Sequence, residues 1–296
     1  MQESESSKTE KNTFSSGSLQ LPPRQARPDD LVGRGFREAY ILHLADTNLI
    51  LAQRNAEWCG HGPVLEQDIA ITNISLDLLG QSRNFYQYAA TLINASKIQE
   101  DLKAPSPKGE GVGGEVTEDS LAYLRPERAF KNCLLAEQPN GDWGQTILRQ
   151  FFFSAYQFLL YQKLQTSNDE QLAAIAAKAL KEVTYHLRWS SEWVVRLGDG
   201  TEESHQRMIK AIDELWRYTG ELFIAVDYEV AAGFDISLLK DDWLKKVTAV
   251  FEEATLPVPE KVFMQTGGKS GVHTEHLGFI LAEMQYLQRA YPNAEW

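Results

Sequence analysis

The chain has 296 residues, 43% of them hydrophobic, which is enough for one large helical bundle or two small domains around a substantial core. Its 41 Asp and Glu outnumber its 29 Lys and Arg, and the formal net charge of −12 argues against nucleic acid or an anionic membrane as a partner. Two cysteines without a C-x-x-C spacing, no long apolar run and no signal-peptide pattern after Met1 are typical of a soluble cytoplasmic protein.

The N-terminal residues 1–30 are rich in Ser, Gln, Lys and Pro and carry few bulky apolar side chains. Such a segment has too little apolar surface to offset its ordering entropy, so we expect a disordered tail. The remaining residues 31–296 are expected to form a single helical domain. A flexible Gly/Pro-rich loop at about 104–117 interrupts this domain, because its composition is incompatible with a helix.

Apolar residues recur at helical spacing in eight segments of this domain, and no segment shows clear strand alternation. The spacing predicts helices over Arg37–Cys59, Val64–Ile93, Leu121–Ala136, Trp143–Leu164, Asp169–Leu197, Thr201–Ala232, Leu239–Ala254 and His276–Tyr291. The Gly60-His61-Gly62-Pro63 segment ends the first of them, and Thr201 is placed to cap the sixth. We therefore predict an all-α protein.

The predicted helix Trp143–Leu164 carries an aromatic run that includes Phe151, Phe153 and Tyr156. Such a run could line a hydrophobic substrate tunnel, but it is more often part of the core or of a helix–helix interface. The sequence contains no nucleophilic triad, phosphate loop or dinucleotide fingerprint, and we assign no catalytic residue.

Two of the predicted helices carry an incomplete pattern for a two-metal site. Carboxylate-bridged metal bundles take a Glu from each of two helices and a Glu-x-x-His pair from each of two others. On Val64–Ile93 the matching positions are Asp77 and Gly80, and glycine has no ligand atom in a side chain. On the other helix Glu182 is followed by Tyr185, and His186 comes one residue late, projecting about 100° from the required direction.

These positions define a vestigial site without metal. The candidates for it are Asp46, Asp77, Glu182 and His186. Buried acids persist when they are paired, so we expect the two Asp residues to form salt bridges with a facing helix, for example with Lys178 or Lys181. Glu182 and His186 are expected to hydrogen-bond within the bundle, although their spacing alone does not exclude a metal. The alternative is an active dimetal oxidase with a degenerate site.

Two further motifs contain histidine. Glu202-x-x-His205 is a literal Glu-x-x-His, but it occupies a first helical turn, where acids are favoured by the helix dipole and face water. His273 and His276 precede a helix without a third ligand nearby in the sequence. We expect neither pair to bind a metal ion.

Several sequence blocks, long and in order, resemble the C subunits of multicomponent phenylacetyl-CoA epoxidases from about residue 31 to the end. The blocks are 57–66 (EWCGHGPVLE), 136–142 (AEQPNGD), 181–188 (KEVTYHLR), 196–204 (RLGDGTEES), 215–219 (LWRYT), 266–269 (TGGK), 273–278 (HTEHLG) and 281–289 (LAEMQYLQR). The resemblance implies a ferritin-like helical bundle with additional C-terminal helices. It also implies membership of an oxygenase complex for aerobic phenylacetate breakdown.

In that family the catalytic di-iron centre belongs to the related A subunit, whereas the C subunit has no cofactor and supports the A subunit. The resemblance therefore implies hetero-oligomeric partners: the A subunit, which would bind most of the phenylacetyl-CoA, a small B subunit, and a reductase that uses NADPH, flavin and an iron–sulfur centre. A free-standing helical binding protein is the third possibility, and it predicts a monomer without partners.

Overall fold

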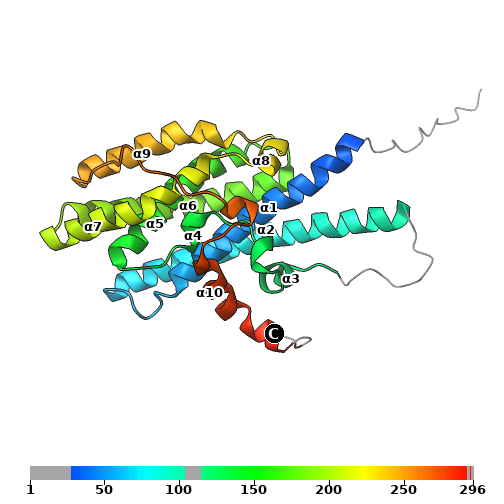
Figure 1. The fold of residues 1–296 in the computed structure, drawn as a ribbon, viewed down its shortest axis with the longest axis horizontal. Helices are drawn as coiled ribbons and strands as arrows, with labels where there is room; N and C mark the ends of the chain where they lie inside the picture. Colours follow the sequence, from blue (N-terminus) through cyan, green and yellow to red (C-terminus); the bar gives the residue numbers. More distant parts are fainter. Residues whose placement is uncertain (1–27, 104–114, 292–293, 295–296) are drawn as a thin grey trace, which may run out of the picture.

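The computed structural model of the chain describes residues 28–103, 115–291 and 294. Within these ranges every regular element is a helix, as Figure 1 shows, which confirms the all-α prediction. The longest helices are α1 (Pro28–Ala56), α2 (Leu65–Lys103), α5 (Trp143–Leu164) and α6 (Glu170–Gly198). α1 packs along α2, α5 packs along α6, and α2 also contacts α6, so the four helices form the central bundle.

Shorter elements surround this bundle. They are α3 (Glu118–Tyr123), α4 (Leu134–Glu137), α7 (Glu202–Leu215), α8 (Asp227–Ala231), α9 (Lys240–Glu253), α10 (Glu275–Met284) and α11 (Tyr286–Ala290). α7 and α9 pack on α5 and α6, and α8 packs on α1. α10 and α11, together called the C-terminal arm, extend away from the body of the molecule (Figure 1).

The aromatic run of α5 lies in the core. Phe151, Phe152 and Phe153 are buried, and Phe152 packs against Trp216 and Trp243 with ring centroids 5.7 Å apart in both pairs. These rings join α5 to the elements that cover it, which matches the core interpretation of the run. Burial of each such ring stabilises the fold by roughly 1.5–3 kcal/mol.

Two predicted helices are wrong. Pro126 divides the predicted helix Leu121–Ala136, because proline disfavours the helical conformation in the residue before it. An irregular segment with one turn of 3-10 helix at Glu127–Ala129 links the short helices α3 and α4 instead. The predicted helix Thr201–Ala232 ends as α7 at Leu215. Two turns of 3-10 helix follow at Trp216–Tyr218 and Gly220–Phe223, and the buried carboxylate of Glu221 is held there by hydrogen bonds from the backbone of Leu134 and Gly267.

The predicted tail 1–30 lies outside the described residues except for its last three, with which α1 begins at Pro28. Most of the predicted loop at about 104–117 also lies outside them, and its last three residues form no regular element. Both regions stay predictions, as does the single domain. None of the described helices is long and apolar enough to cross a membrane.

Candidate functional site

A chain of hydrogen-bonded polar side chains lies in the middle of the bundle, with members on all four long helices. Asn48 on α1 and Gln157 on α5 are joined by a 2.6 Å hydrogen bond from Gln157 Nε2 to Asn48 Oδ1. Both also donate to the hydroxyl of Tyr161 on α5, each over 3.1 Å. That hydroxyl donates to Oε1 of Gln81 on α2 over 3.2 Å, and Gln81 Nε2 donates to Glu182 on α6 over 2.9 Å. We call these five residues the central network.

The central network draws side chains from four long helices, as a two-metal site in a bundle does, but it lacks the chemistry of such a site. Such centres need carboxylates from all four helices and an imidazole from two of them. The network instead offers three neutral amides, a phenol and one carboxylate, and burial raises the pKa of the Tyr161 hydroxyl well above its ordinary value, which disfavours a phenolate ligand. In the ranges that the structure describes, no group of three or more His, Cys, Asp and Glu side chains is placed to hold a metal ion.

The donor set of this chain therefore does not fit a di-iron centre. Amide side chains and a neutral phenol satisfy one another's hydrogen bonds, which a buried polar group requires. Oε1 of Gln157 is the one buried side-chain atom of the network without a hydrogen-bond partner among the described residues. The chemistry of these residues supports a structural centre that joins four helices.

His186 and Asp77 lie beside this network and pair with each other. His186 Nε2 is 2.9 Å from Asp77 Oδ2, and the imidazole is fully buried while the carboxylate is 37% exposed. The hydrogen-bond partner of Asp77 is thus a histidine on α6, whereas the predicted partners Lys178 and Lys181 are exposed. Gly80 is also exposed, and a side chain there would meet nothing within 4 Å, so the Asp77–Gly80 spacing does not point into the bundle.

Asp46 lies apart from the other three candidates, and its predicted lysine partners are wrong. Its fully buried carboxylate pairs with Arg125, which follows α3 in the segment that was predicted to be helical. It also accepts hydrogen bonds from the hydroxyl of Tyr86 over 2.5 Å and from the backbone N–H of Lys131 over 2.8 Å. Burial alone would lower the pKa of Arg125, but the charge of Asp46 raises it above its ordinary value, so the guanidinium keeps its charge.

The other Glu-x-x-His motif does not form a ligand pair either. Thr201 caps α7 as predicted, accepting a hydrogen bond from the backbone of Ser204. Glu202 is exposed and accepts a hydrogen bond from Gln206, while His205 contacts the carbonyl of Gly198 through Nδ1 over 2.7 Å. The two side chains thus have separate partners.

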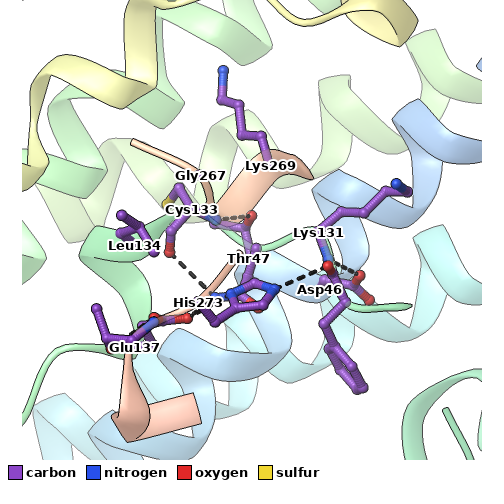
Figure 2. A network of polar contacts seen from close by, with 12 residues as sticks. Asp46, Thr47, Lys131, Cys133, Leu134, Glu137, Gly267, Lys269 and His273 are labelled. Carbon is purple, nitrogen blue, oxygen red and sulfur yellow. Dashed lines mark hydrogen bonds and ion pairs between the residues drawn. The ribbon is translucent and has the colours of Figure 1, made fainter. Parts of the chain in front are cut away.

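A second buried network joins the segment between α3 and α4 to the segment before α10. Figure 2 shows Glu137 and His273 side by side in it, with Lys131, Cys133 and Asp46 close by. Glu137 accepts hydrogen bonds from Asn132 Nδ2 over 2.8 Å and from the backbone and hydroxyl of Thr274 over 2.7 and 2.8 Å. His273 Nδ1 lies 2.9 Å from the same carboxylate. One buried carboxylate thus fixes the start of α10.

His273 is positively charged in the folded protein. Its Nδ1 faces the Glu137 carboxylate and its Nε2 lies 3.0 Å from the carbonyl of Phe130, so both nitrogens face acceptors and both must donate. Burial alone would lower the pKa of His273, but the hydrogen bond and charge of Glu137 together with the Phe130 carbonyl raise it above its ordinary value.

Glu221 plays the corresponding role for the glycine-rich block 266–269. Its carboxylate accepts hydrogen bonds from the backbone N–H groups of Leu134 over 2.7 Å and of Gly267 over 2.8 Å. At Gly268 the two segments touch: a side chain there would come within 2.4 Å of the carbonyl oxygen of Asn132. Only glycine allows this approach, which explains the block Thr266–Lys269 as a packing requirement.

Lys269 completes this network by pairing with a buried acid. Its Nζ lies 2.9 Å from Oε1 of Glu229 on α8, and both side chains are buried. His43 on α1 lies 3.7 Å from the same carboxylate through Nε2, and its Nδ1 is 2.7 Å from the carbonyl of Lys131. Burial is the largest influence on His43 and lowers its pKa, despite the opposing charge of Glu229, so His43 is neutral and donates to that carbonyl.

A buried side chain of the core likewise fixes the block 136–142. Arg149 on α5 is fully buried and donates from Nη1 to the carbonyl of Gln138 and from Nη2 to Oδ1 of Asn140, each over 2.5 Å. Burial, with a smaller contribution from Arg54, lowers the pKa of Arg149 to about 9. The guanidinium therefore fixes the turn before α5, and the block has a structural role.

Sequence analysis missed four of the five members of the central network. Asn48, Gln81, Gln157 and Tyr161 are neutral, whereas the metal-ligand pattern contains only acids and histidines. The sequence signal for them is an Asn or Gln among the apolar positions of three different long helices, because a buried amide needs a hydrogen-bond partner on another helix. Glu182 is the one candidate residue that belongs to the network.

Four long helices that send polar side chains to a common centre define the class of ferritin-like bundles, here with amides in place of metal ligands. The model of the PaaA_PaaC family, described as phenylacetic acid catabolic protein, matches residues 34–296, and the chain belongs to this family. It is 49% identical over 263 residues to the C subunit of 1,2-phenylacetyl-CoA epoxidase from Escherichia coli (strain K12), covering 87% of this chain and 98% of that protein.

Proposed function

We propose that this chain is the non-catalytic, structural subunit of a cytoplasmic phenylacetyl-CoA epoxidase and supports a di-iron catalytic subunit. The observation that carries the proposal is the central network, which joins all four long helices through amides and a phenol instead of metal ligands. Membership in the family and the likeness to an epoxidase subunit support the assignment to this complex. The B subunit and the reductase would complete the enzyme.

The test is a change at Glu182, the one carboxylate of the central network. The variant Glu182→Gln keeps the shape and an acceptor for Gln81, so we expect a loss of about 1 kcal/mol in the free energy of unfolding. Turnover and iron per assembled complex should stay unchanged, since neither depends on this chain's carboxylate. Both are measured on the complex after co-expression with the catalytic subunit.

An inactive or iron-depleted complex of unaltered thermal stability would contradict the proposal and favour the active dimetal oxidase. Gln81→Leu is the matched control, because it removes the hydrogen bond to Glu182 and the acceptor of the Tyr161 hydroxyl without touching a carboxylate. It should lower the free energy of unfolding more than Glu182→Gln does, because two hydrogen bonds are lost, and it should leave turnover unchanged.

An apolar stripe on the outer face of α2 is the surface that we assign to the catalytic subunit. Leu65, Ile69, Leu76 and Leu79 are 72%, 52%, 60% and 45% exposed, and their spacing places them on one side of the helix over about 21 Å. A stripe of large exposed apolar side chains on a globular protein marks an interaction site. A protein with the same bundle fold could lay a helix against it.

We expect Leu76→Glu to weaken assembly with the catalytic subunit at least about tenfold, because a charge would be buried against apolar surface. The folded chain should be unaffected, since Leu76 is 60% exposed. The matched control is Leu238→Glu, at a residue that is 68% exposed and lies outside the stripe. Co-purification and titration of the two subunits measure the effect; equal affinities of the two variants would remove α2 from the interface.

A further inference from the structure

Gly80 lies inside the long helix α2, at a point where the packing of this chain does not require a glycine. Glycine destabilises a helix relative to alanine, because it loses more backbone freedom on folding. Gly80 is exposed, and a Cβ added there would meet nothing within 4 Å. At Gly268, by contrast, a Cβ would come within 2.4 Å of the Asn132 carbonyl oxygen. A glycine with open space beside it is suited to a molecule that approaches α2 from outside.

The open space at Gly80 adjoins the apolar stripe of α2. At about 100° per residue, Gly80 lies about 40° around the helix axis from Leu76 and about 100° from Gln81 on the other side. Leu76 belongs to the stripe and is 60% exposed, whereas Gln81 is buried and hydrogen-bonds to Glu182 of α6 over 2.9 Å. The surface is therefore low between the stripe and the outer face of α6. A second backbone can come close to α2 there.

Three cations lie on the outer face of α6 beside Gly80. Lys178, Lys181 and Arg188 are exposed, and none of them forms an ion pair with another residue in the part of the chain that the structure describes. The hydrogen bonds between α2 and α6 set Gly80 level with Val183, so all three cations lie within about 8 Å of it along the helix axis.

The surroundings of these cations leave them available to a partner. The guanidinium of Arg188 lies 5.9 Å from the ring centroid of Tyr185, which is 39% exposed. The carboxylate of Glu182, on the same helix, accepts its hydrogen bond from α2 instead. In a chain with a formal net charge of −12, three cations without acidic partners form a surface that complements an acidic molecule.

We propose that an acidic helix of the catalytic subunit crosses α2 at Gly80. Its backbone lies close to Gly80, its apolar side chains pack on Leu76 and Leu79, and its carboxylates face Lys178 and Lys181. This inference rests on the proposed function and deepens it by naming the occupant of the stripe. A second copy of this chain, paired by two-fold symmetry through the same patch, would bring the cations of both copies together, which disfavours it.

The first experiment is Gly80→Leu in the full chain, titrated with the catalytic subunit by calorimetry. The new side chain fills the space of the partner's backbone, so we expect assembly to weaken at least about tenfold. The isolated variant should melt about 2–4 °C higher than the parent chain, because leucine favours a helix over glycine. Opposite effects on stability and assembly separate a contact with the partner from a folding defect.

Gly35→Leu on α1 is the matched control. Gly35 is also an exposed helical glycine at which a Cβ would meet nothing within 4 Å, but it lies outside the stripe. The control should bind the catalytic subunit like the parent chain.

The second experiment tests the charge of the partner helix. The double variant Lys178→Glu, Lys181→Glu should bind the catalytic subunit at least about tenfold more weakly than the parent chain at about 50 mM salt. The difference should shrink at about 500 mM salt, because ions screen the attraction between exposed charges. Lys240→Glu with Lys246→Glu on α9 makes the same change in net charge at exposed residues and should have no such effect.

The outcomes separate this inference from the proposed function. If Gly80→Leu binds like the parent while Leu76→Glu weakens assembly, the crossing at Gly80 is overturned and the stripe remains the surface for the catalytic subunit. If neither variant weakens assembly, α2 is not in the interface and both assignments of this surface fail. If Gly80→Leu abolishes self-association of the chain but not binding of the catalytic subunit, the occupant is a second copy and the proposal is overturned.

Discussion

Asp46→Asn should lower the free energy of unfolding by roughly 3–5 kcal/mol. The change keeps the shape of the side chain but removes the charge that neutralises Arg125, leaving a buried cation without its partner. It also weakens the acceptor of the hydrogen bonds from Tyr86 and Lys131. Denaturant unfolding of the isolated chain measures the loss.

The matched control is Glu203→Gln on α7. Glu203 also pairs with an arginine, Arg207, over 2.6 Å, but the two side chains are 75% and 55% exposed. Solvent screens such a pair, so we expect no measurable change in stability. If Asp46→Asn were as mild as Glu203→Gln, the Asp46–Arg125 pair would not hold the segment after α3 in place.

A double change separates the cost of an unpaired charge from other effects. Adding Arg125→Met to Asp46→Asn removes the orphaned cation, and part of the lost stability should return. Arg125 also donates to the carbonyls of Leu121 and Ala129, so the recovery should be incomplete. If the double variant lost more free energy of unfolding than the two single variants together, the ion-pair interpretation would be contradicted.

The sequence predicted the long helices because their burial pattern is local. Helix α5 begins at Trp143 and ends at Leu164, as its aromatic spacing predicted, and α6 agrees with its prediction to within one residue at either end. The segment 124–137 was missed for a local reason as well. Its buried apolar residues imitate a helical pattern, but Pro126 disfavours the helical conformation in the residue before it.

The partners of the candidate residues could not be predicted in this way. Arg125 lies 79 residues from Asp46, and Asp77 lies 109 residues from His186. A buried acid could pair with any of several arginines and lysines. The choice depends on how the segments cross in the fold, and helical spacing carries no information about that crossing. The sequence did show that Glu182 and His186 were out of register for a metal pair. It could not show that amides on the other helices fill the centre.

The buried histidines make stability depend on pH in two opposite directions. The raised pKa of His273 means that the folded state binds its proton more tightly than the unfolded state does. Its contribution is fully present below about pH 6.5 and is lost as the pH rises through the raised folded value. The lowered pKa of His43 has the opposite sign, so stability also falls as the pH drops below about 6.5.

Glu137→Gln should remove the alkaline part of this dependence along with much of the stability. The hydrogen bond and charge of Glu137 are the largest influences that raise the pKa of His273, so without them its burial favours the neutral ring. Breaking this buried pair should cost roughly 3–5 kcal/mol near neutral pH. Free energies of unfolding measured from about pH 6 to about pH 9 should then decline less steeply in the variant than in the parent chain.

Hydrogen exchange shows where the loss acts. Because Glu137 also holds the backbone and hydroxyl of Thr274 at the start of α10, we expect the arm to exchange faster in Glu137→Gln, while α5 and α6 keep their relative protection. The control Glu275→Gln changes an exposed acid next to Thr274 and should leave both the pH slope and the exchange of the arm unchanged. A variant at Glu137 that retained the parent's slope above about pH 6.5 would mean that another group, and not the His273–Glu137 pair, couples protonation to the anchoring of the C-terminal arm.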